Sequence, residues 1–128
     1  MPGATDTMRG VLVVDDDHAV CRLFQLFLQR LDLAATVAHD RAAAERLLAA
    51  RPWRLLITDL QLEGASEGLE LAALAVSLSP RVPTILVSGY GGPDVADAAS
   101  RCGADLYLPK PVSFADFSAA VRSLLPPV

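Results

Sequence analysis

The chain has 128 residues, enough for one domain that buries about two-thirds of the surface its unfolded form would expose. A net charge of −4, with basic residues scattered singly, argues against a nucleic-acid-binding surface, which normally carries a basic stripe. No apolar run approaches the roughly 18 residues of a membrane span, and Cys21 and Cys102 form no metal-ligand spacing. We therefore expect one cytoplasmic domain over residues 10–126, after a flexible lead-in at residues 1–9 that lacks the character of a signal peptide.

Short β-rich runs alternate with helical patterns along the chain. Three of these runs are nearly continuous apolar stretches, which is typical of strands covered on both faces of a parallel sheet. In chain order, the predicted strands are VLVVD (11–15), AATVA (34–38), RLLIT (54–58), PTILVS (83–88) and DLYL (105–108).

Amphipathic helical patterns follow these strands. The first has an apolar stripe at helical spacing from Val20 to Leu31. The others begin or end at residues that cap or break helices. The second helix begins after Asp40 and ends before Pro52, and the third runs from about 67 to 79 and ends at Pro80. The fourth opens at Pro93, and the fifth runs from Ser113 to about 125, ahead of Pro126.

Alternating strands and helices with short connections predict a parallel sheet with right-handed crossovers. Five such repeats in this length fit the flavodoxin-like arrangement. The sequence therefore predicts an α/β fold with a doubly wound, five-stranded parallel sheet in the order 2-1-3-4-5 and helices on both faces.

Reactive side chains follow four of the five predicted strands. Because the carboxyl ends of parallel strands share one edge of the sheet, these side chains should converge in one crevice. If the first strand lies beside the third, their acidic residues meet there. In chain order, the residues are Asp15-Asp16-Asp17, Asp59, Ser88 and Lys110.

This combination of side chains indicates phosphoryl chemistry. Clustered carboxylates resist joint ionisation without a cation, and Mg²⁺ is a hard ion that takes carboxylate and phosphate oxygens. Once the charge is neutralised, one carboxylate can act as a nucleophile, with Lys110 and Ser88 as donors to the phosphoryl oxygens. Each residue alone has an ordinary explanation: Asp17 as a helix N-cap, Ser88 as a turn residue and Lys110 as a surface charge.

The segments VLVVDDD, LLITDLQL, TILVSGY and GADLYLPKP resemble the diagnostic segments of response-regulator receiver domains, the CheY-like modules of two-component systems. The resemblance covers nearly the whole chain from Val11 onward. It implies that Asp59 is the phosphoacceptor and that Asp15 and Asp16 are the acidic pair of a Mg²⁺ site. Asp59 and the main-chain carbonyl of Gln61 complete that site.

The resemblance also implies a switch. Ser88 follows the phosphoryl group, Lys110 is its cationic partner before a cis Pro111, and Tyr107 is the aromatic switch residue. The same resemblance implies a sensor histidine kinase or a phosphotransfer protein as the phosphoryl donor. It also implies a signalling switch that catalyses its own phosphorylation and dephosphorylation and is not an enzyme with a separate substrate.

The partner that receives the signal is not apparent from the sequence. The resemblance implies that this output partner, or a second copy in a homodimer, binds the face formed by the helix from Pro93, the strand at 105–108 and the helix at 113–125. Neither DNA nor a membrane is expected as a direct partner. Whether the chain works alone or within a longer regulator stays open.

The chain departs from the family pattern in the loop after Asp59. Glu63 stands where the family commonly has proline, and Gly68 arrives one position late, so this loop has gained a residue. Gly89 stands where alanine is frequent, and Pro109 is unusual before the lysine.

Two histidines lie near the acidic cluster or its strands in the sequence. We expect His18 to face solvent on the first turn of the first helix. We expect His39 to lie away from the crevice, because it ends the second strand.

Three other functions fit parts of the pattern. A haloacid-dehalogenase-type phosphatase would use Asp15 as nucleophile and Asp17 as general acid, but it leaves Asp59 idle and lacks a second acidic pair. A flavin or nucleotide binder would need a glycine- or hydroxyl-rich phosphate loop where this chain has aspartates. A receiver used only for docking would not need the competent residues found at every matched position.

Overall fold

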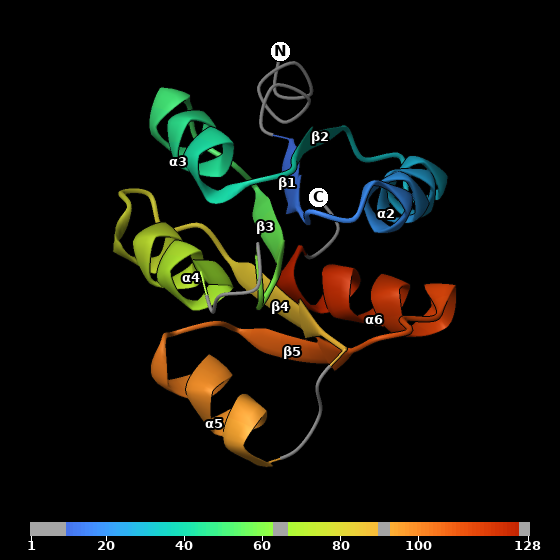
Figure 1. Ribbon diagram of the computed structural model, residues 1–128. Coiled ribbons are helices and arrows are strands. Elements are labelled where there is room, and N and C mark those ends of the chain that lie inside the picture. The colour runs from blue at the N-terminus through green and yellow to red at the C-terminus, as the bar shows by residue number, and fades with distance from the viewer. Residues whose placement is uncertain (1–9, 63–66, 90–92, 126–128) are drawn as a thin grey trace.

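The computed structural model describes residues 10–62, 67–89 and 93–125 of the chain (Figure 1). Five parallel strands form one sheet in the order β2-β1-β3-β4-β5, which confirms the predicted topology. The strands are β1 (Val11–Val14), β2 (Ala35–Ala38), β3 (Leu55–Asp59), β4 (Thr84–Ser88) and β5 (Leu106–Pro109). The helices are α2 (His18–Arg30), α3 (Arg41–Ala50), α4 (Glu67–Ser77), α5 (Pro93–Arg101) and α6 (Phe114–Leu124).

Helices cover both faces of the sheet, with α2 and α6 on one face and α3, α4 and α5 on the other (Figure 1). The two faces follow from the alternation of side chains along each strand. On β1, Val11 and Val13 pack toward α2 and α6, whereas Leu12 and Val14 pack toward α3 and α4. Both sets are fully buried, which explains why the strand reads as a continuous apolar run.

The predicted N-caps are confirmed. The side chain of Asp17 accepts from the amides of Ala19 and Val20 at the start of α2. Asp40 accepts from Ala43 at the start of α3, and Ser113 accepts from Asp116 at the start of α6. Each cap satisfies main-chain donors that the first turn leaves unpaired, and so fixes where the helix starts after its strand.

The sheet register brings the ends of the central strands together. Val14 pairs with Thr58, so the residues after β1 lie beside Asp59 at the end of β3. Asp59 pairs with Val87, and Ser88 pairs with Pro109. The predicted convergence at the carboxyl edge is therefore confirmed at the level of the main chain.

Candidate functional site

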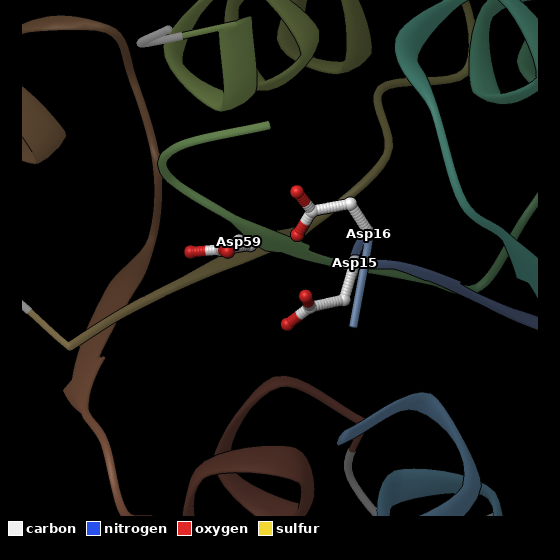
Figure 2. A group of neighbouring side chains, drawn as sticks. All are labelled: Asp15, Asp16 and Asp59. Atoms are coloured by element: carbon white, nitrogen blue, oxygen red, sulfur yellow. The ribbon is translucent and has the colours of Figure 1, made fainter. Parts of the chain in front are cut away.

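Three carboxylates meet at the carboxyl edge of the sheet. One oxygen each of Asp15, Asp16 and Asp59 lies within 4.8 Å of the others (Figure 2). Asp15 is buried, Asp59 is largely buried and Asp16 is exposed, so the cluster opens to solvent on one side. This grouping follows from the adjacency of β1 and β3.

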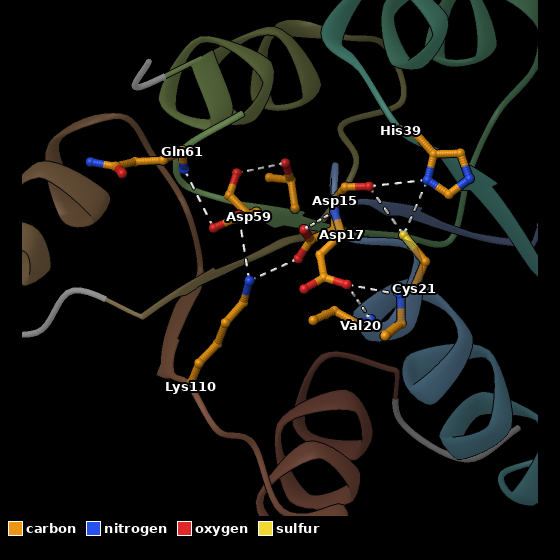
Figure 3. A network of polar contacts seen from close by, with 10 residues as sticks. Asp15, Asp17, Val20, Cys21, His39, Asp59, Gln61 and Lys110 are labelled. Carbon is orange, nitrogen blue, oxygen red and sulfur yellow. Dashed lines mark hydrogen bonds and ion pairs between the residues drawn. The ribbon is translucent and has the colours of Figure 1, made fainter. Parts of the chain in front are cut away.

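The ammonium group of Lys110, which follows β5, reaches across to the same cluster (Figure 3). Its Nζ lies 2.9 Å from Oδ2 of Asp15 and 3.4 Å from Oδ2 of Asp59. The lysine side chain is 22% exposed, and its two partners are more deeply buried. The site therefore brings one cation together with three carboxylates at the edge of the sheet.

The electrostatics leave negative charge to be neutralised. Burial raises the pKa of Asp59, and the nearby charge of Asp15 raises it further, against the opposing effect of Lys110. Burial lowers the pKa of Lys110, but its hydrogen bond to Asp15 and the charges of Asp15 and Asp59 outweigh burial and raise it overall. Lys110 thus stays protonated, but its single positive charge cannot neutralise three carboxylates.

This donor set fits a hard divalent cation. All three groups offer oxygen, the ligand atom that Mg²⁺ and Ca²⁺ prefer. Burial and the charge of Asp15 raise the pKa of Asp59, and a bound cation would favour its ionised form against both effects. The partly open geometry also leaves room for the water and phosphate oxygens that Mg²⁺ normally keeps. We therefore find the residues suited to Mg²⁺.

The remaining predicted site residues lie around this cluster. The amide of Gln61 donates to Oδ1 of Asp59 at 3.4 Å. Ser88 is buried at the end of β4, and its carbonyl accepts from the amide of Lys110 at 2.8 Å. The Lys110–Pro111 peptide is cis, as the resemblance implies. Tyr107 lies earlier on β5 and packs under α5, not in the acidic cluster.

Gly68 is needed where α4 approaches the Asp59 loop. A Cβ at this position would lie 1.9 Å from the Asp59 carbonyl oxygen and 2.7 Å from Cα of Leu60. The Gly68 amide also donates to the Leu60 carbonyl at 2.9 Å. The start of α4 therefore packs directly on the main chain that carries Asp59, which only glycine permits. The predicted extra residue beside Glu63 lies outside the described residues.

The expectation for His39 was wrong. Its Nδ1 lies 3.2 Å from the carbonyl oxygen of Asp15, so the ring lies next to the acidic cluster (Figure 3). The exposed ring of His18 stacks on it, with centroids 3.7 Å apart and planes 4° from parallel. The missed signal was the register: Val14 pairs with Ala38, which brings the next residue of each strand close together.

Comparison with known proteins identifies relatives across nearly the whole fold. A family model of the response regulator receiver domain matches residues 11–122. The response regulator PilR of Pseudomonas aeruginosa is 32% identical over 89% of this chain and 25% of its own length. The photosynthetic apparatus regulatory protein RegA of Rhodovulum sulfidophilum is 32% identical over 91% of this chain and 65% of its own. The chain thus spans less than two-thirds of these relatives.

Solved structures show the same similarity. A response regulator from Burkholderia pseudomallei, solved with a phosphorylated aspartic acid, a calcium ion and citrate, gives a TM-score of 0.80 at 29% identity, over 94% of this chain and 76% of that one. A receiver protein from Burkholderia phymatum gives 0.79 at 30% identity, over 91% and 94%. No helix in the described ranges is long and apolar enough to cross a membrane. The chain belongs to the response regulator receiver domains, the signalling switches of two-component systems.

Proposed function

We propose that the chain accepts a phosphoryl group on Asp59, in a Mg²⁺-dependent transfer from the phosphohistidine of a sensor kinase or phosphotransfer protein. One observation carries this proposal: Asp59 lies beside the acidic pair that follows β1, and its Oδ2 is 3.4 Å from the ammonium of Lys110. The phosphorylated aspartic acid and calcium ion of the Burkholderia pseudomallei regulator support it by similarity. The proposed receiver unit covers residues 10–126.

Asp15, Asp16 and Asp59, with the main-chain carbonyl of Gln61, would hold the Mg²⁺. When bound, Mg²⁺ neutralises phosphoryl oxygens and the acidic cluster, so that an anionic donor can approach an anionic acceptor. The cluster of three carboxylate oxygens within 4.8 Å supports this assignment. Without that neutralisation, the repulsion between Asp15 and Asp59 opposes the ionised acceptor.

In the transfer step, a carboxylate oxygen of Asp59 attacks phosphorus and forms a P–O bond. The P–N bond to the donor histidine breaks, and the leaving imidazole takes up a proton. Lys110 offsets charge on the phosphoryl oxygens, and the Ser88 hydroxyl donates a hydrogen bond to one of them. The signal ends when water attacks phosphorus: the P–O bond to Asp59 breaks, inorganic phosphate leaves and the carboxylate is regenerated, so dephosphorylation is a second reaction of the same site.

The signal would leave through β5 and the helices on either side of it. The hydroxyl of Ser88 moves toward the phosphoryl group, and Tyr107 turns inward into the space it leaves. The Ser88 carbonyl accepts a hydrogen bond from the Lys110 amide. Tyr107 lies on β5, which ends at Pro109, directly before Lys110. An output partner or a second copy would bind the face formed by α5, β5 and α6.

The phosphatase alternative receives no support. It needs the Asp17 carboxylate as a general acid, but this side chain accepts from the Ala19 and Val20 amides as the cap of α2 (Figure 3). Those bonds engage the carboxylate as an acceptor at the start of α2, which is the ordinary role of an N-cap. Asp59, which that alternative leaves idle, is one of the three carboxylates of the cluster.

Peptide mapping separates the two interpretations. The chain is incubated with a small phosphodonor and Mg²⁺, the acyl phosphate is trapped by reduction, and the modified peptide is sequenced by mass spectrometry. We expect the modification on Asp59. Modification of Asp15 in its place would contradict the proposal and favour the phosphatase.

A further inference from the structure

Asp15 is held at each of its polar groups. Its amide donates to the Ala38 carbonyl, Oδ1 accepts from the Asp17 amide at 2.9 Å, and Oδ2 accepts from Lys110. Its carbonyl oxygen lies beyond the last residue of β1, where β2 has also ended. A buried carbonyl without a donor is costly, so the donors to this oxygen matter for the site.

Two side chains meet the Asp15 carbonyl (Figure 3). The thiol of Cys21 donates to it at 3.2 Å, and Nδ1 of His39 lies at 3.2 Å. A carbonyl oxygen only accepts and has two lone pairs, so it can take both bonds if Nδ1 carries the proton. The contact between Nδ1 and the Asp15 carbonyl is a hydrogen bond only if Nδ1 carries a proton.

The His39 ring is held in this orientation from α2. His18 lies flat against it, with centroids 3.7 Å apart and an angle of 4° between the planes. Cys21, on the same helix, lies 3.7 Å from Nδ1. The first turns of α2 therefore fix both the plane of the ring and the second donor to the Asp15 carbonyl.

The Asp15 carbonyl is part of the planar peptide unit that joins Asp15 to Asp16. Rotation of this unit would redirect the main chain from which both carboxylates project. Two of the three oxygens of the acidic cluster belong to these neighbouring residues. A donor that holds the carbonyl therefore also holds the relative orientation of the acidic pair.

We propose that His39 is a positioning residue for the cation site: its Nδ1–H binds the Asp15 carbonyl and fixes the peptide unit between Asp15 and Asp16. This inference rests on the proposed function, in which that pair holds Mg²⁺. Partners that orient metal ligands are worth about 10–100-fold in metal affinity when they are removed. His39 ligates nothing itself; it acts through the main chain of Asp15.

The test compares His39→Ala with His39→Asn. The asparagine side chain places an amide nitrogen as many bonds from Cα as Nδ1 of histidine, so it can keep the donor without the ring. Mg²⁺ affinity is measured by calorimetry at one fixed pH, and melting temperature is measured in EDTA. We expect His39→Ala to weaken Mg²⁺ binding by about tenfold and His39→Asn to recover most of the affinity, whatever either does to melting.

Unchanged Mg²⁺ affinity in His39→Ala would overturn the inference, and so would an asparagine variant as weak as the alanine variant. A wild-type chain that binds no Mg²⁺ would overturn the proposed function as well, which separates the two failures. If the alanine variant does not fold, nitrogen-15 NMR of the wild-type chain decides the matter. The inference requires the neutral His39 ring to be protonated at Nδ1, and protonation at Nε2 would contradict it.

Discussion

The two faces of the sheet are packed differently near the proposed site. On the face under α2 and α6, four aromatic rings pack together, with Phe117 at 5.1 Å from both Phe24 and Phe27 and Phe114 at 5.3 Å from Phe27. Under α5, the buried cluster consists of Ala72, Leu86 and Ala99, with partly buried residues such as Tyr107 around it. The aromatic face is built on interlocked rings, whereas two of the three buried residues in the cluster under α5 are alanines.

This difference matches the two roles in the proposed function, a fixed cation site after β1 and an output face that rearranges at α5 and β5. The acidic pair follows β1, a fully buried strand whose side chains on one face pack into the aromatic core. The proposed output strand β5 is only partly buried along its length. Regions with little buried apolar surface open at low free-energy cost, so the α5 corner can rearrange while the acidic cluster stays fixed.

The largest expected effect is on stability at the aromatic face. Phe117→Ala removes a buried ring that touches two others, and should lower the free energy of unfolding by about 3–5 kcal/mol. Ala99→Gly, at the α5 corner, should lower it by only about 1 kcal/mol, mainly through helix propensity. Chemical denaturation of both variants measures the contrast. Equal losses would contradict the proposed difference between the two regions.

The loss of one carboxylate from the acidic cluster should weaken Mg²⁺ binding without destabilising the fold. Asp16→Asn is expected to weaken Mg²⁺ binding by more than about tenfold, because even the outer partners of metal ligands are worth that much. In EDTA the variant should melt at the same temperature as the wild type or higher, since a repelling carboxylate is gone. Unchanged Mg²⁺ affinity would remove Asp16 from the site.

The raised pKa of Asp59 gives the metal-free protein a pH dependence with a definite sign. A raised folded-state pKa means that stability is fully present below the unfolded-state value, about 3.9, and is lost as pH rises through the folded-state value. Asp59→Asn does not titrate, so in EDTA it should gain stability over the wild type as pH rises from 4 to 7. Melting curves of both proteins at several pH values test this. An advantage of Asp59→Asn in melting temperature that grows toward low pH would refute it.

The smallest effect is expected in local dynamics. Amides of α5 and β5 should exchange faster than those of β1 and β3, because the cluster under α5 has fewer buried apolar side chains than the aromatic face. Addition of Mg²⁺ and a phosphoryl mimic should change protection mainly within residues 88–112. Changes confined to α2 and α3 would show that the signal leaves by another route.

The fold was predictable because its signals are local and agree with one another. Buried strands read as apolar runs, and the caps Asp17, Asp40 and Ser113 each mark a helix start that the structure confirms. The meeting of the acidic residues after β1 and β3 followed from the rule that parallel strands end at one edge.

Side-chain direction was not predictable in the same way. Whether His39 faces the cluster depends on the β1–β2 register and on the ring that His18 stacks against it, both of which are tertiary features. The need for glycine at position 68 likewise depends on how closely α4 approaches the main chain of Asp59. Tyr90, the last residue of the TILVSGY segment, lies outside the described residues.

The central claim is that Asp59 is the Mg²⁺-dependent phosphoacceptor, and intact mass spectrometry tests it most directly. Wild type and Asp59→Asn are each incubated with a small phosphodonor, with Mg²⁺ or with EDTA. We predict that the wild type gains the mass of one phosphoryl group only with Mg²⁺, and that Asp59→Asn gains none. A phosphoryl adduct on Asp59→Asn, or one that forms equally well in EDTA, would contradict the account.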